Sequence, residues 1–305
     1  MISQPIFYKI SQLFLIMLIG FALVKTGFVK SKDSLLLSKL SLYLLMPSVI
    51  IKSFNTKVTN DIAIGLILSF AVAILVHLVF VIMDFCLKKT GRFTVVERAS
   101  FMYPNAGNLV IPIVSYALGG EWVIYTLGYI IVQIVFLWTH GVRLYSSGEK
   151  FNIKKIVLNV NIISVLIGLM IMISGFTIPD FVGDIFVSFA DMIGPVGMLI
   201  AGMLAAEIDF GKMLKNKRLY MVLVVRLIVY PLIVLLILKA VLLFVKIPNA
   251  HTILLVLYLS TVTPVAATLT QFSQVYDKEV DYAVVINALT TVGCVITMPV
   301  FAGLF

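Results

Sequence analysis

Two apolar stretches of the chain each carry a proline beside amide or hydroxyl side chains, an arrangement that could bind an anion inside a membrane. The stretches are residues 103–112 and 259–268. A proline inside a helix removes one hydrogen bond and collides with the carbonyl four residues back. We therefore expect Pro112 and Pro264 each to interrupt a helix and to free a carbonyl. In hydrocarbon a freed carbonyl costs several kcal/mol unless protein or water satisfies it, so interruptions in both halves of a chain indicate a transporter binding site.

The residues around the two prolines suit a carboxylate ligand. A half-helix that starts at Pro112 or Pro264 would point the positive end of its dipole, roughly half a charge, at the membrane centre. Unpaired N–H groups at such an end bind anions. Asn105 and Asn108 add amide donors and acceptors, and Gly107 allows the backbone to leave helical geometry. The alternative is a kinked helix whose asparagines only satisfy the freed carbonyls.

Further polar side chains lie at the same depth in neighbouring apolar segments. Thr263 is adjacent to the second proline and is the hydroxyl expected to contact a ligand, although such hydroxyls often bond only to their own helix. Gln133 and Asn287 are amides in the middle of apolar segments. They either line the site or bond neighbouring helices.

Two ionisable residues also lie inside apolar segments, where a charge is expensive and usually functional. Arg226 either supplies a fixed positive charge for an anion, or snorkels to the nearby membrane end or caps carbonyls at a helix break. His77 could relay a coupling proton, because histidine changes charge near neutral pH. The alternative for His77 is a neutral ring bonded to a backbone carbonyl.

Acidic residues are missing at this depth, since those that come nearest lie close to the predicted helix ends: Asp84, Glu97, Asp191 and Glu207. This argues against a carboxylate-centred cation site. The sequence also lacks the motifs of metal-dependent, nucleotide-hydrolysing and serine enzymes. We therefore expect a protein that is not an enzyme and that binds neither a metal nor a cofactor.

The elements that must hold these residues are membrane-spanning helices. Hydrophobic residues make up 61% of the chain and charged residues 12%, and the mean hydropathy is +1.13. A soluble domain has roughly 45–50% apolar and about 25% charged residues. The net charge of +9 therefore does not indicate a nucleic-acid partner, because Lys and Arg gather in the cytoplasmic loops of membrane proteins.

A spanning helix needs about 20 apolar residues, and by this rule the chain holds ten spans. They are residues 6–25, 34–54, 62–86, 97–119, 122–141, 156–175, 182–206, 219–244, 252–274 and 280–304. The predicted fold is an all-α membrane protein in which the fourth and ninth spans are broken and cross.

The basic residues of the loops predict the orientation of the chain. Every second loop is basic and carries Lys25, Lys30, Lys32, Lys88, Lys89, Arg92, Arg143, Lys150, Lys154, Lys155, Lys212, Lys215, Lys217, Arg218 and Lys278. The opposite loops carry only Lys52, Lys57 and Lys246. Under the positive-inside rule the first set is cytoplasmic, so both termini are expected outside.

The two halves of the chain resemble each other. Leu18-Ile-Gly-Phe21 is echoed by Leu166-Ile-Gly-Leu169, and Thr26-Gly-Phe28, Pro47 and Pro112 are matched at similar offsets by Ser174-Gly-Phe176, Pro195 and Pro264. The predicted repeats are residues 1–155 and 156–305. Because each repeat has an odd number of spans, five, the second must be inserted with the opposite orientation, as in many secondary transporters.

These residues carry a resemblance to a known family. The segment Asn105-Ala-Gly-Asn108-Leu-Val-Ile-Pro112, with Pro264, Arg226 and Pro231, resembles the auxin efflux carrier family over essentially the whole chain. The resemblance implies an elevator-type carrier with the site where spans four and nine cross. It also implies a scaffold of spans 1, 2, 6 and 7 and a transport domain of spans 3–5 and 8–10. The lack of a long hydrophilic loop after span five is typical of small prokaryotic members.

The expected function is secondary transport of a small organic anion, a carboxylate, across the cell (plasma or inner) membrane. Besides this ligand and the lipid bilayer, a second copy of the chain is a candidate partner. One alternative is a sodium-coupled carrier similar to the bile-acid symporters. Another alternative is a membrane sensor that does not transport, or a channel.

Overall fold

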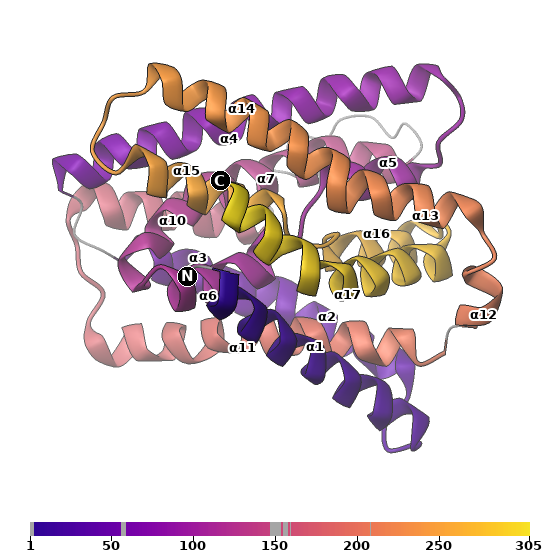
Figure 1. Cartoon of the computed structure of the whole chain (residues 1–305). Helices are drawn as coiled ribbons and strands as arrows, with labels where there is room; N and C mark the ends of the chain where they lie inside the picture. The colour runs from indigo at the N-terminus through magenta and orange to yellow at the C-terminus, as the bar shows by residue number, and fades with distance from the viewer. Residues whose placement is uncertain (1–2, 56–58, 147–153, 155–157, 159, 208) are drawn as a thin grey trace.

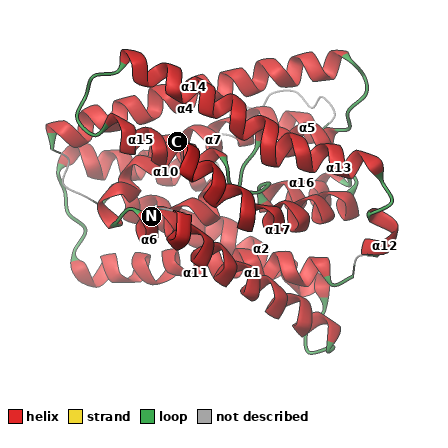
Figure 2. Ribbon diagram, in the orientation of Figure 1, coloured by secondary structure: helices red, strands yellow, loops and turns green. Residues whose placement is uncertain are grey.

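The computed structural model describes residues 3–55, 59–146, 154, 158, 160–207 and 209–305, and these are helical apart from turns and one isolated β-bridge (Figures 1 and 2). The α-helices are α1 (Ser3–Lys25), α2 (Ser34–Leu40), α3 (Met46–Phe54), α4 (Asn60–Lys89), α5 (Val95–Met102), α6 (Ile111–Ala117), α7 (Thr126–Phe136), α8 (Val142–Tyr145), α10 (Val160–Ser174), α11 (Asp180–Ala205), α12 (Phe210–Met213), α13 (Lys217–Val224), α14 (Tyr230–Phe244), α15 (Ala250–Thr261), α16 (Ala267–Tyr276) and α17 (Val280–Leu304). The ends of these helices, single or joined, fall within a few residues of the ends of the predicted spans.

Several helical runs are long and apolar enough to cross a membrane. In the described residues six meet both conditions: Ser31–Phe54, Asn60–Lys89, Gly120–Tyr145, Asp180–Ala205, Lys217–Phe244 and Val280–Leu304. Three further apolar helices are shorter, namely Ser11–Lys25, Val160–Ser174 and Ala250–Thr261. Several apolar side chains on the outside of the bundle are largely exposed, such as Phe244 at 84%. The chain is therefore built as a multi-pass membrane protein.

Three helical runs contain one π-helical turn directly before a proline. The turns are η2 (Ser41–Leu45), η3 (Ala106–Val110) and η6 (Val225–Val229), and each is followed by a helix whose second residue is Pro47, Pro112 or Pro231. A π-turn inserts one extra residue, which lets the helix continue where proline removes a donor. The prediction that Pro112 interrupts its helix is therefore wrong, because η3 runs directly into α6.

The helices pack in two groups with the broken helices between them. Helix α1 packs along α11, and α3 packs on α10 and α11, whereas α4 packs on α7 and α14 on α15. In Figure 1, α4 and α14 run along one side of the molecule and α1 and α11 along the other, with α5, α6, α15 and α16 between. The division into a scaffold and a transport domain stays a prediction.

Helices α1 and α11 are in backbone contact through two glycines. A Cβ atom on Gly202 would collide with the backbone of Met17 and Phe21, and one on Gly20 would collide with the backbone of Leu199. Small residues allow such close approach, and dispersion contacts then hold the pair together in lipid.

We expect Gly202→Ala to lower the thermal midpoint of the detergent-solubilised protein clearly, because backbone atoms cannot move aside for a methyl group. Overpacking of this kind costs about 1–3 kcal/mol. Gly120→Ala is the matched control, since a Cβ on Gly120 meets nothing within 4 Å. Equal midpoints for the two variants would contradict the close packing of α1 on α11.

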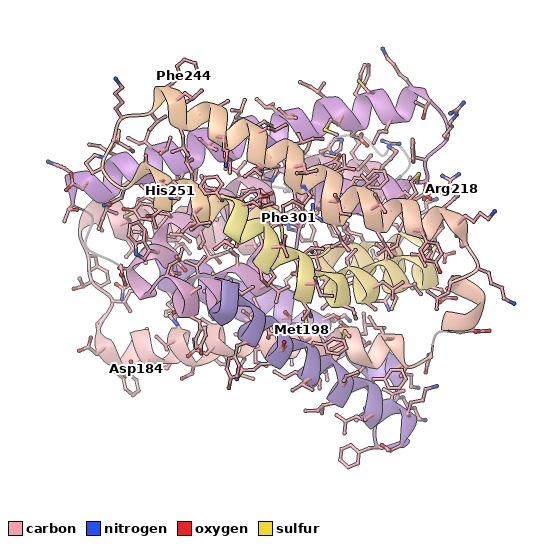
Figure 3. All side chains as sticks on the ribbon, in the orientation of Figure 1. Asp184, Met198, Arg218, Phe244, His251 and Phe301 are labelled. Carbon is pink, nitrogen blue, oxygen red and sulfur yellow. The ribbon has the colours of Figure 1, made fainter. Side chains whose placement is uncertain are left out.

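Labelled residues from the two predicted sets of loops lie towards opposite ends of the bundle. Figure 3 places Arg218 at one end of the bundle and Asp184 and His251 towards the opposite end. This agrees with the alternation of loops that the sequence predicts. Lys57, Lys150 and Lys155 lie outside the described residues, and the side of the membrane that each end faces stays a prediction.

Candidate functional site

Two broken helices meet in the centre of the molecule. The first is interrupted at residues 103–105, between α5 and η3, and the second at residues 262–266, between α15 and α16. The amide of Asn105 donates to the Pro264 carbonyl at 2.7 Å, and the amide of Ala266 donates to the Tyr103 carbonyl at 3.0 Å. Pro104 and Val265 thereby form an antiparallel bridge. One donor and one acceptor of each break are thus satisfied by the other break, as hydrocarbon requires.

The first break therefore lies at Pro104, two turns before the predicted position, while the second contains Pro264 as predicted. The residue before a proline is pushed towards an extended conformation. Tyr103 has φ −104° and ψ 102°, which ends α5. That rule applies to Pro104 and Pro112 alike, so it makes Pro104 a candidate for the break without deciding between them.

Amides from two neighbouring helices hold the centre of this crossing. Gln133 on α7 donates from Nε2 to the Pro104 carbonyl at 2.6 Å, and Asn287 on α17 donates from Nδ2 to the Val265 carbonyl at 2.8 Å. The side chains of both amides are buried. The two bridge residues are thus supported in the same way by equivalent donors, which fixes the position of each break.

Arg226 binds the carboxyl ends of α5 and α15, the two helices that precede the breaks. Its guanidinium donates to the carbonyls of Phe101 at 3.3 Å, Thr261 at 2.7 Å and Thr263 at 2.6 Å. The residue is 1% exposed, and within the described part of the chain it forms no ion pair with a carboxylate. The negative ends of two helix dipoles compensate this buried charge. This is the carbonyl-capping arrangement, and direct contact with an anion stays a prediction.

A small cavity of about 40 Å³ borders the crossing. Its described lining residues come from α7, from both breaks and from the start of α3: Met46, Pro104, Asn105, Gly107, Ile130, Gln133, Ile134, Leu137, Ala266 and Thr268. A water needs about 10–15 Å³ by this measure, so the cavity in this conformation holds a few atoms of ligand or water. None of the described lining residues is acidic.

Two residues of the cavity lining each carry a buried side-chain atom that has no hydrogen-bond partner in the described structure. These atoms are Nδ2 of Asn105, a donor, and Oε1 of Gln133, an acceptor. Buried polar atoms in native proteins are nearly always paired. The two residues are therefore the candidates for polar contacts with a ligand or water at the cavity.

Helix amino ends add to the positive character of the cavity. The helical run that starts at Ala106 and the helix α16 both begin at the cavity, where Asn105, Gly107, Ala266 and Thr268 line it. Their dipoles place partial positive charge there. The opposite, negative ends of α5 and α15 are capped by Arg226. The positive amino ends of the helices at the crossing thus lie at the cavity, and the negative carboxyl ends lie at Arg226.

The structure places the other predicted residues away from the described cavity lining. The Thr263 hydroxyl bonds the Ser260 carbonyl at 3.1 Å, and Nδ1 of His77 lies 2.8 Å from the carbonyl of Ala73. The His77 ring packs against Tyr129 and Phe136. The side chains of Asn108 and Pro112 lie outside the described part of the structure. Ligand contact by these residues, and proton relay by His77, stay predictions.

Met46 and the apolar lining residues beside Gln133 were not predicted as site residues. Ile130, Ile134 and Leu137 recur with Gln133 at the spacing of one helical face, so this face indicates them. No sequence pattern indicates Met46, because it reaches the cavity only through the packing of α3. Its methyl group also fills the space that a Cβ on Gly107 would need.

The comparison with known families agrees with the fold and with the repeat. The family model for membrane transport proteins matches the chain twice, over residues 5–156 and 146–302. No curated protein sequence matches the chain significantly. The two matches cover nearly the whole chain and confirm the resemblance drawn from the residues around the breaks. The chain therefore belongs to the membrane transport protein family, the group that includes the auxin efflux carriers, and it is a transporter rather than an enzyme.

Proposed function

We propose that this protein is a secondary transporter of a small organic anion, a carboxylate, which binds in the cavity at the crossing. The observation that carries the proposal is the buried, unpaired amide nitrogen of Asn105, a residue that lines a cavity at the amino ends of two helices. A carboxylate accepts hydrogen bonds from amide donors and is stabilised by helix amino ends. The buried charge of Arg226 adds a favourable field from the other side of the crossing.

The proposed mechanism is an elevator movement between two inverted five-helix repeats with ten spans in all. Helices α1, α3, α10 and α11 would form the scaffold, and the crossing would travel with α4, α7, α14 and α17. The cavity supports this because Met46 of α3 faces Asn105, Gly107 and Gln133 of the other group across it. Sliding the crossing past Met46 would change the side from which the cavity is reached.

The protein would work in the cell membrane with the Arg218 end in the cytoplasm and both termini outside. The support for this is the excess of Lys and Arg in the loops at that end. The expected ligand is then a metabolite anion that crosses between cytoplasm and exterior.

A thermal-shift screen of the purified protein tests ligand class. Small mono- and dicarboxylates should raise the midpoint in proportion to the logarithm of their concentration, whereas the matching amides should not. The screen is run with and without sodium and at two pH values. No shift with any acid would count against the proposal, and stabilisation by sodium alone would favour the sodium-coupled alternative.

A further inference from the structure

A buried chain of ionisable side chains leads from one end of the molecule to the crossing. Arg98 of α5 donates to both oxygens of Asp84 on α4, at 2.7 and 2.8 Å. Nε2 of His140 lies 3.2 Å from the nearer Asp84 oxygen, and Nδ1 of the same ring lies 2.9 Å from the Tyr103 hydroxyl. His140 belongs to the π-turn η5 (Leu137–Gly141), and Tyr103 belongs to the first break.

The hydrogen bonds of this chain fix where protons can lie. The bidentate Arg98 keeps Asp84 as a carboxylate that only accepts, so Nε2 of His140 must carry a hydrogen. In the neutral ring Nδ1 is then an acceptor. The single hydroxyl hydrogen of Tyr103 faces two acceptors, this Nδ1 and the Phe136 carbonyl at 3.1 Å, and can serve only one well.

Protonation of His140 at Nδ1 satisfies every group at once. The imidazolium donates from Nε2 to Asp84 and from Nδ1 to the Tyr103 oxygen, while the Tyr103 hydroxyl donates to the Phe136 carbonyl. One proton is taken from solution, and only the hydroxyl hydrogen of Tyr103 turns. The arrangement is thus complementary to the charged ring.

The proton site is connected to the cavity through the break. Gln133 and His140 lie about two turns apart on one helical run, and both contact the first break. Gln133 bonds the Pro104 carbonyl, and His140 contacts the hydroxyl of the preceding residue, Tyr103. The Tyr103 carbonyl in turn accepts from Ala266, which lines the cavity. A change at His140 therefore acts on residues that form the ligand site.

The surroundings single out His140 among the three histidines of the chain. The charged or titratable groups that face it are Asp84, Arg98 and Tyr103, with the neutral phenols of Tyr129 and Tyr230 behind them. Its side chain is 21% exposed, while that of Asp84 is 5% exposed.

We propose that His140 binds a proton whose uptake is coupled to anion binding at the crossing, which makes the protein a proton-coupled carrier. This inference rests on the proposed function for the identity of the second ligand. The added positive charge favours an anion in the cavity, and by linkage the anion favours the proton. His77 has no acidic partner in the described structure.

Nitrogen NMR of the protein with ¹⁵N-labelled histidine tests the proton site without any substrate. The signals absent from His140→Gln identify the ring. They should change from those of a neutral ring with Nε2 protonated to those of imidazolium as the pH is lowered. A His140 ring that stays neutral throughout would overturn the proposal.

Proteoliposomes test the coupling. For an acid that the thermal-shift screen identifies, acidifying the outside should raise initial uptake by wild type by about fivefold or more, after subtraction of protein-free vesicles. His140→Gln should keep exchange of internal for external acid and lose this stimulation, whereas His251→Gln, at an exposed histidine, should retain both. Exchange by wild type without any stimulation of its initial uptake by the pH gradient would overturn the coupling and leave the proposed function standing. Absence of exchange in every variant would refute the proposed function, and the NMR titration would still decide the proton site.

Discussion

Replacing Arg226 by methionine is expected to destabilise the protein by about 3 kcal/mol or more, the largest effect of any single substitution considered. Methionine fills a similar volume but leaves the carbonyls of Phe101, Thr261 and Thr263 without their donor. Each buried polar group left unpaired costs about 1–3 kcal/mol. The two breaks would then lose the contact that joins the ends of α5 and α15.

The measurement is the fraction of monodisperse protein after extraction, together with its thermal midpoint. Lys239→Met is the control, because Lys239 is exposed and lies on the same helical run, in α14. Arg226→Lys should fall between the two, since one ammonium group cannot reach all three carbonyls in the geometry of a guanidinium fork. If Arg226→Met were as stable as Lys239→Met, the capping role of Arg226 would be wrong.

Asn105→Ala is expected to weaken ligand binding by roughly 10- to 100-fold while leaving the thermal midpoint of the ligand-free protein nearly unchanged. A hydrogen bond to a charged group contributes about 1.5–3 kcal/mol. The amide nitrogen of Asn105 has no partner within the described structure, so its removal breaks no bond to that nitrogen. Binding and stability should therefore separate in this variant.

The affinity is measured by the ligand dependence of the thermal midpoint, using an acid that stabilises wild type. Thr139→Ala is the control, since its hydroxyl bonds the Val135 carbonyl at 2.6 Å and the residue is absent from the described cavity lining. Asn105→Asp should bind still more weakly than Asn105→Ala, because a second carboxylate would repel the ligand. Unchanged affinity in both Asn105 variants would place the ligand elsewhere.

Much of the fold follows from hydropathy alone. Apolar runs of the required length locate the long helices within a few residues, because lipid demands an unbroken apolar surface and internally paired backbone. The positions of the breaks are harder to predict from the sequence. Pro112 and Pro104 are both prolines in one apolar stretch, and only the partner backbone at Pro264 and Val265 decides which of them becomes the break.

Some residues of the candidate site could likewise be predicted from the sequence, and others could not. Asn105 and Gln133 stand out from the sequence because a polar amide in an apolar segment needs a partner. Arg226 stands out too, but whether it meets a ligand or a carbonyl depends on helices far apart in the chain. His140 and Asp84 lie near helix ends, where polar residues are ordinary, and only the packing of α4 against α5 and η5 brings them together.

Counterflow in proteoliposomes tests the central claim, that the crossing carries a small organic anion across the membrane. Vesicles loaded with an unlabelled acid that stabilises the protein are diluted into the labelled acid, and its entry is followed over time. Wild type is expected to give rapid, saturable entry. At low concentrations of labelled acid, entry with Asn105→Ala is expected to be slower than with wild type by a factor of about ten or more. Entry no faster than in protein-free vesicles for every stabilising acid, or equal rates for wild type and Asn105→Ala, would contradict the claim.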